Sequence, residues 1–144
     1  MKDPAVNVKA GYFSRLNDLV VNDVGTLKIY DGVDQTAGFP YLYFGSITAN
    51  TAIPETKFNR GYQCSVQIQI VTAAKGNSGG FYDAERISQA VTTAVGTVGD
   101  FITATGYNVI TTTLESAINI SEPYQSGMLF KRILTFTHQI AEIN

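Results

Sequence analysis

The segment "CSVQIQIVT" at positions 64–72 constrains the fold most, because apolar and polar side chains alternate along its first seven residues. Successive side chains of a β-strand point to opposite faces, so this pattern gives one apolar face and one polar face. The apolar set is Cys64, Val66, Ile68 and Ile70, and the polar set is Ser65, Gln67 and Gln69. The segment therefore predicts a half-exposed strand that needs apolar cover on one side only.

The C-terminal part of the chain shows a similar alternation twice. In "YNVITTTLESAINIS" the apolar residues of one parity are Ile110, Leu114, Ile118 and Ile120. In "MLFKRILTFTHQIAEI" they are Phe130, Leu134, Phe136 and Ile140. The intervening "EPYQSG" contains the proline, serine and glycine that are typical of turns. We expect a long antiparallel hairpin that closes the sheet.

Two other segments have helical periodicity. Asp3 and Pro4 suit an N-cap and a first helical position. The apolar residues that recur after them are Val6, Ala10, Phe13, Leu16, Leu19 and Val20, which predicts a helix from about 4 to 22. A second helix is predicted from Phe81 onward, with Asp83 and Glu85 in its first turn. Its apolar stripe consists of Ala84, Ile87, Val91, Ala94, Val95 and Val98.

The segment "FPYLYFGSITA" predicts a strand with an unusual need for cover. Apolar or aromatic side chains occupy both parities from Tyr41 to Phe44, so a helix on each face or a partner subunit must cover them. A short strand, "TLKIYDG", precedes it, and a polar link, "NTAIPETKFNRGYQ", follows it. The fold class predicted is α+β, an antiparallel sheet of about four or more strands with two main helices packed on it.

Composition limits the classes of function. The chain has 144 residues, 44% of them apolar, which suits one domain over 1–144. The net charge of -2 and the scattered Lys and Arg give no basic face for a nucleic-acid backbone. Cys64 is the only cysteine, so no intrachain disulfide forms. "MKDPAVNVKAGYF" lacks the apolar core of a signal peptide, and no run of ~18 apolar residues suggests a membrane span. We expect a soluble protein made in the cytosol.

A glycine-rich stretch, Gly76 to Gly80, matches the G-x-S-x-G pattern that can expose a nucleophilic serine, here Ser78. Such a serine needs a histidine base, and the sole histidine is His138, with Asp100 as a possible acid. The serine turn of α/β-hydrolases follows a buried, continuously apolar parallel strand, whereas the strand here alternates with glutamines. We favour a glycine-rich loop before a helix, and a serine hydrolase stays an alternative.

Cofactor and metal motifs are absent from the sequence. A phosphate-binding Walker loop needs Lys and Ser or Thr after its last glycine, but Phe81 and Tyr82 follow Gly80. Cys64 and His138 are one residue of each kind, too few for a soft-metal cluster. We predict no cofactor, no metal and no enzymatic activity.

The order of segments is more informative than any single motif. A helix, the "PYLYFGSI" strand, a long polar link, "SVQIQIVTAAKGNSGGFYDAERISQAV" and a final "MLFKRILTFTHQI" strand follow one another. This order resembles the tail-completion or tail-terminator proteins of long-tailed bacteriophages. In that family a Pro-Tyr strand ending at a glycine precedes an alternating strand, a glycine-containing loop and a helix that starts near an acidic pair. The resemblance spans residues 4 to 142.

The resemblance implies a role in the virion. Proteins of this family form a homohexameric ring on the last ring of the tail tube, stop tube polymerisation and join the tail to head-completion or stopper proteins. DNA passes through the lumen of the ring. The resemblance implies no catalytic residue, no cofactor and no membrane association. It also implies that the protein is made in the host cytoplasm. A head–tail connector or stopper, or a minor tail subunit, is the alternative structural role.

Candidate contact residues are aromatic or basic side chains in three segments. The aromatic strand, the polar link and the positions beside the glycines supply them, because each segment suits a surface that a neighbour covers. They are Tyr41, Tyr43, Phe58, Arg60, Tyr62, Phe81 and Tyr82. The alternative for each aromatic residue is an ordinary place in the core. The lack of a basic stripe suits a channel through which DNA slides, since strong phosphate contacts would retain it.

Overall fold

A computed structural model describes residues 3–32, 38–53, 61–75, 80–125 and 127–143. The elements in these ranges are α1 (Ala5–Leu16), β1 (Leu19–Val21), β2 (Gly25–Leu27), β3 (Ile29–Tyr30), β4 (Tyr41–Ile53), β5 (Gly61–Lys75), α2 (Tyr82–Gly96), β6 (Tyr107–Tyr124) and β7 (Gly127–Glu142). Among the described residues, no helix has the length and hydropathy needed to span a membrane.

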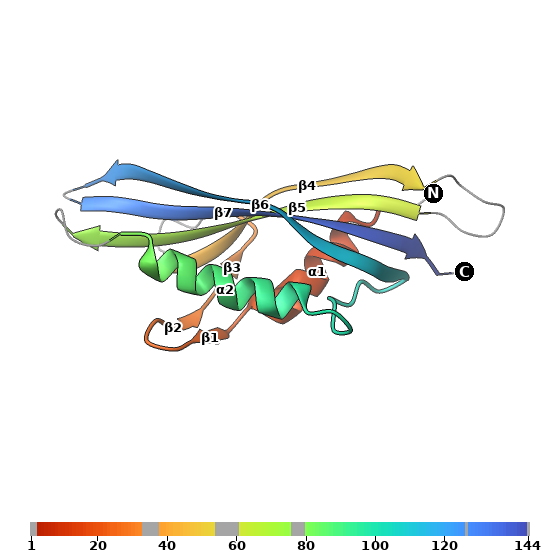
Figure 1. The fold of residues 1–144 in the computed structure, drawn as a ribbon, viewed down its shortest axis with the longest axis horizontal. Coiled ribbons are helices and arrows are strands. Elements are labelled where there is room, and N and C mark those ends of the chain that lie inside the picture. The colour runs from red at the N-terminus through yellow and green to blue at the C-terminus, as the bar shows by residue number, and fades with distance from the viewer. Residues whose placement is uncertain (1–2, 33–37, 54–60, 76–79, 126, 144) are drawn as a thin grey trace.

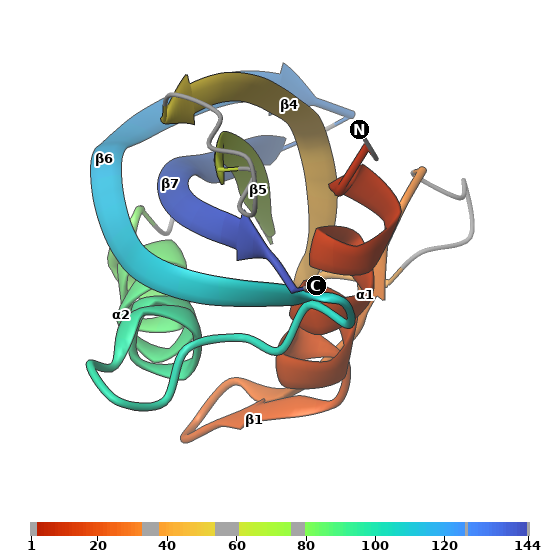
Figure 2. The same cartoon turned by 90° about the vertical axis from the view of Figure 1, so that its right-hand side faces the viewer.

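The main sheet has the strand order β3-β4-β5-β7-β6. β3 pairs with β4 in parallel, and every other neighbouring pair in this sheet is antiparallel. Figure 1 shows α1 and α2 on the same side of this sheet, together with the small β1-β2 ribbon. Turned by 90°, the long strands are strongly curved (Figure 2). The predicted α+β class, with two helices packed on an antiparallel sheet, is confirmed.

The core lies between the helices and one face of the sheet. The predicted apolar face of β5 is fully buried, from Cys64 to Ile70. The residues that α1 buries against it are Val8, Tyr12 and Leu16, and those of α2 are Ala84, Ile87, Val91 and Val95. The alternation of β5 and the stripe of α2 as far as Val95 therefore predicted the core correctly, because each element buries only the face that its sequence makes apolar. The prediction for Val98 is wrong, since α2 ends at Gly96 and Val98 is 88% exposed.

The first helix is shorter than the sequence predicted. It ends at Leu16, since Asn17 is already extended and Asp18 has a φ of 67°. The next residues pair with Gly25–Leu27 as a β-hairpin instead of continuing the helix. Adjacent valines at 20 and 21 and an Asn-Asp pair at 22 and 23 favour a strand and a turn, so the prediction of helix to 22 is wrong.

The predicted C-terminal hairpin is confirmed as β6 and β7, but the apolar residues of β6 are not core. Ile110, Leu114, Ile118 and Ile120 are 51%, 39%, 53% and 41% exposed. Register shifts near Thr111 and near Ser116 move the alternation from one face of β6 to the other. β6 is also the last strand of the sheet, so it lacks a neighbour on one side within the described structure.

Both faces of β4 are covered near its start, as its sequence requires. Leu42 and Phe44 face the helices, whereas Tyr41 packs with Val71 and Leu129 on the opposite face. Among the described residues no helix lies on that second face (Figure 1). The cover comes from a small cluster of this chain's own side chains, and neither a second helix layer nor a partner subunit is needed at this end of the strand.

Candidate assembly interface

The side of the main sheet that faces away from α1 and α2 (Figure 1) is a candidate surface, and we call it the open face. Strand register aligns its side chains in rows across β4, β5, β7 and β6. One row consists of Thr48, Ser65, Thr137 and Thr113, and the next of Asn50, Gln63, Gln139 and Thr111. Both rows carry hydroxyl and amide groups and no ionised side chain. Such a surface can meet water or DNA without holding a phosphate backbone by charge.

A third part of the open face carries a hydrogen-bonded chain of side chains. The Tyr43 hydroxyl donates to Oε1 of Gln69, and Nε2 of Gln69 donates to Oε1 of Gln67 at 3.3 Å. The Gln67 side chain lies across Gly45, where a Cβ atom would collide with it. Gly45 therefore allows the glutamine amides to lie flat on the sheet, at the point where β4 changes register.

One end of the open face is aromatic, and we call this set the aromatic patch: Tyr30, Phe39, Tyr41, Tyr43 and Tyr124. Tyr41 is central, with ring centroids 6.0 Å from Tyr30, 5.4 Å from Phe39 and 6.2 Å from Tyr43. Tyr124 on β6 contacts Phe39 at 5.6 Å, so the patch joins the two outer strands. Burial, followed by the neighbouring Tyr43, raises the pKa of the Tyr41 hydroxyl, which stays protonated.

An ion pair sits beside the aromatic patch. Nζ of Lys131 lies 2.7 Å from Oε1 of Glu122, between β7 and β6. Partial burial opposes the charge of Lys131, but the hydrogen bond and charge of Glu122 outweigh it and raise the pKa of the lysine. The pair is neutral as a unit, so it adds no net charge to the open face.

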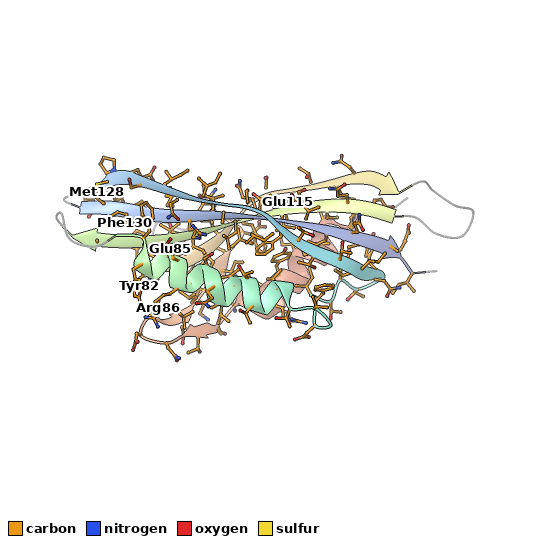
Figure 3. The ribbon with its side chains drawn as sticks, in the orientation of Figure 1. Tyr82, Glu85, Arg86, Glu115, Met128 and Phe130 are labelled. Carbon is orange, nitrogen blue, oxygen red and sulfur yellow. The ribbon has the colours of Figure 1, made fainter. Side chains whose placement is uncertain are left out.

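A second group of exposed side chains lies where α2 begins. Tyr82 is 71% exposed, with the Arg86 guanidinium 5.6 Å from its ring centroid. Figure 3 shows Tyr82, Glu85 and Arg86 at the same end of the molecule as Met128 and Phe130, with Glu115 apart from them. Phe81 packs edge-on against Phe130 at 5.1 Å. A hollow of about 250 Å³ lies between this helix start and the β5 and β7 ends.

The predicted contact residues fall in different places. Tyr41 and Tyr43 lie together in the aromatic patch, and Phe81 and Tyr82 lie at the start of α2. Tyr62 is 3% exposed and packs on Tyr107 in the core, which leaves little of it for a neighbour. Phe58 and Arg60 lie outside the described residues.

Sequence reasoning missed the edge of the sheet as a candidate surface. Tyr30, Phe39 and Tyr124 come from three separate segments that only the fold brings together. The long edge strand β6 did leave a signal: positions 107–124 contain no Lys or Arg, the residues that commonly protect an exposed strand.

The serine-hydrolase hypothesis finds no support in the described residues. His138 is fully buried, and its Nε2 and Nδ1 contact the hydroxyls of Tyr12 and Thr112. Burial lowers the pKa of His138 to about 4, so the ring is neutral and holds α1 against β7. The Asp100 carboxylate accepts a hydrogen bond from Arg15 at 3.0 Å, so acid and base have other partners. Ser78 lies outside the described residues.

The other chemically interesting groups are also part of the packing. Cys64 is buried, and burial raises the pKa of its thiol to about 11. Within the described ranges, no three His, Cys, Asp or Glu side chains gather closely enough to hold a metal ion. A shallow groove of about 450 Å³ runs between β1 and α2, where Arg86 donates to the Asn22 carbonyl oxygen at 2.6 Å.

No protein-family model matches the chain, and no curated protein matches it. Its fold is nevertheless similar to a chain in the solved structure "Virion of native gene transfer agent (GTA) particle". The similarity has a TM-score of 0.70 and covers 98% of this chain and 99% of that chain, at 17% sequence identity. The two chains share a fold over nearly their whole length, although few of their residues are identical.

Proposed function

We propose that this chain is a structural virion protein that forms a ring at the head-proximal end of a tail tube. The ring ends tube polymerisation and joins the tail to head-completion or stopper proteins. The observation that carries this proposal is the fold shared with a chain of a gene transfer agent virion, because it extends over 98% of the sequence. The independent resemblance of the segment order to phage tail terminators gives the more specific role.

Two features of the surface support this role. The polar rows of the open face hold hydroxyl and amide groups without charge, as in a channel that must release DNA. The buried His138 contacts the Tyr12 hydroxyl and serves packing. The partners proposed are further copies of this chain, a tail tube protein and a head-completion protein, with DNA only passing through.

Size-exclusion chromatography with light scattering, followed by negative-stain imaging with purified tail tubes, tests the role. We expect a homohexameric ring, alone or at one tip of each tube, and shorter tubes when the protein is present during polymerisation. Protein that stays monomeric with tubes would contradict the proposal. Rings that bind heads and never tubes would instead indicate the connector or stopper role.

The enzymatic alternative has a separate test. We expect Ser78→Ala to assemble as the parent does, and an active-site serine probe to leave the protein unlabelled. Labelling that disappears in Ser78→Ala would establish a reactive serine and contradict a purely structural role.

A further inference from the structure

The main sheet ends in two long open edges. β6 forms one edge over Tyr107–Tyr124, and β4 forms the other, since β3 pairs with it only at Leu42 and Tyr43. From Phe44 to Ile53, no described strand pairs with the free side of β4. Within the part of the chain that the structure describes, no further strand uses the outward backbone N–H and C=O groups of these two edges.

Neither edge carries a lysine or an arginine, although β6 has Pro123 near its end and both strands contain register shifts. Positions 44–53 contain no charged residue, and positions 107–124 contain Glu115 and Glu122 but no Lys or Arg. Glu122 is already paired with Lys131 of its own chain. Four isoleucine or leucine side chains of β6 are also exposed. Proteins that stay monomeric commonly place lysines or short strands at such edges, so two long edges without a lysine indicate that both are covered in the assembled state.

The strand directions match the two edges to each other. β4, β5, β7 and β6 alternate in direction, so β4 and β6 run opposite ways. Copies related by rotation about an axis along the strands keep these directions. β6 of one copy would thus meet β4 of the next in antiparallel orientation, which continues the alternation without interruption. A pairing of β6 with β6 would leave both β4 edges open.

We propose that β6 of one copy pairs with the Phe44–Ile53 edge of β4 in the next copy. This contact joins two different surfaces, so repeating it with closure gives a ring. The helices lie on one side of the sheet and make that side bulky, so the ring closes with α1 and α2 outward and the polar rows of the open face toward the lumen (Figure 2). This inference rests on the proposed ring function and names the surfaces that would build it.

Backbone geometry identifies which edge groups such a contact would use. Proline has no N–H, and Pro123 fits β6 only if its nitrogen faces away from β7. The register from Ser116 to Tyr124 is regular, and every second residue of a strand directs its N–H to the same side. Asn119 lies four residues before Pro123, so its N–H also points away from β7. On β4, the Leu42 N–H points outward to Lys28. After the register shift between Phe44 and Ile47, the backbone N–H of Ala49 points outward in the same way.

Two proline variants with matched controls test the contact. Asn119→Pro removes an outward donor of β6 and the 2.8 Å side-chain contact to Arg132, whereas Asn119→Ala removes only the side-chain contact. Ala49→Pro removes an outward backbone donor of β4, and Ala49→Ser keeps that donor and serves as the control. Light scattering should show single chains for both proline variants and rings for both controls. Circular dichroism should show that all four variants are folded.

Mixing the proline variants gives the sharper result. Asn119→Pro keeps a usable β4 edge and Ala49→Pro keeps a usable β6 edge, so the mixture should form one-to-one heterodimers that cannot grow. Self-association of Ala49→Pro alone would indicate β6–β6 pairing and overturn the proposal. Rings of both folded proline variants would overturn it while leaving the ring function intact. A parent protein that remains a single chain even with tail tubes would instead contradict the ring function itself.

Discussion

The two faces of the main sheet differ in burial and in the polarity of their side chains. The face toward α1 and α2 is dry, with every apolar side chain of β5 from Cys64 to Ile70 fully buried. The open face carries rows of hydroxyl and amide groups, and its buried side chains include Tyr41, Val71 and Leu129 at one end and Thr137 in one of the polar rows. The difference indicates that the helix side supplies the stability of the single chain. We propose that the open face and the edges beside it serve assembly.

The largest effect on stability is expected on the helix side. Phe136 is 1% exposed and packs against Tyr12, so Phe136→Ala would leave a cavity and cost about 3–5 kcal/mol of the free energy of unfolding. Urea denaturation followed by circular dichroism measures this. Val98→Ala, at an 88% exposed position, is the control and should change little. A loss below about 1 kcal/mol at Phe136 would contradict the assignment of stability to this side.

Acid should weaken the same side through His138. Its pKa is about 4 in the folded chain and 6.5 when unperturbed, so between these values the unfolded chain binds a proton that the folded chain does not. Stability is therefore full above pH 6.5 and falls as the pH drops toward 4, by up to about 3 kcal/mol. Unfolding of the parent and of His138→Gln should be compared across this range. An equal slope in both proteins would remove His138 as the cause.

A smaller loss of stability is expected from substitutions in the aromatic patch. Tyr41 is 7% exposed but has a single layer of neighbours, so Tyr41→Ala should cost about 2 kcal/mol, less than the core substitution. Tyr41→Phe keeps the ring contacts and serves as its control in thermal unfolding. If Tyr41→Ala were as damaging as Phe136→Ala, the open face would contribute as much to the fold as the helix side.

The smallest effect is expected in the polar rows. Thr113 is exposed on the edge strand, and Thr113→Val should change the free energy of unfolding by less than about 0.5 kcal/mol. Gln139→Lys should also leave the fold intact but slow the release of DNA from assembled particles, because it adds phosphate contacts. DNA release as quick as in the parent would argue against a lumen position for these rows.

Part of the helix side could be predicted from sequence, because β5 and α2 each bury one apolar face. The stripe predicted for α1 was wrong at Val6 and Phe13, which are exposed, and Val8 and Tyr12 are buried instead. The alternation of "CSVQIQIVT" and the stripe from Ala84 to Val95 report burial directly, and both were confirmed. The predicted end of α1 was wrong because the apolar residues at 19 and 20 fit both the spacing of a helix and a strand. β6 was misread because two register shifts, which no periodicity shows, moved its isoleucines to the surface.

The candidate interface was less accessible to sequence reasoning. Apolar side chains on both parities of a strand correctly predicted a second covered face at Tyr41, and contact of Tyr41 and Tyr43 with a neighbouring subunit stays a prediction. The edges of β4 and β6 depend on strand order, and the aromatic patch joins residues from Tyr30 to Tyr124. Such partners are set by topology, and local patterns do not encode them.

Hydrogen exchange of the backbone amides in free and assembled protein tests the central claim most directly. In the free chain, the outward amides of Asn119 and Ala49 should exchange quickly, whereas those between β5 and β7 should be protected. Assembly on tail tubes should slow exchange at both edges together and leave the amides between β5 and β7 as protected as before. Edge amides that exchange as quickly in the assembled ring as in the free chain would contradict the pairing of β6 with β4.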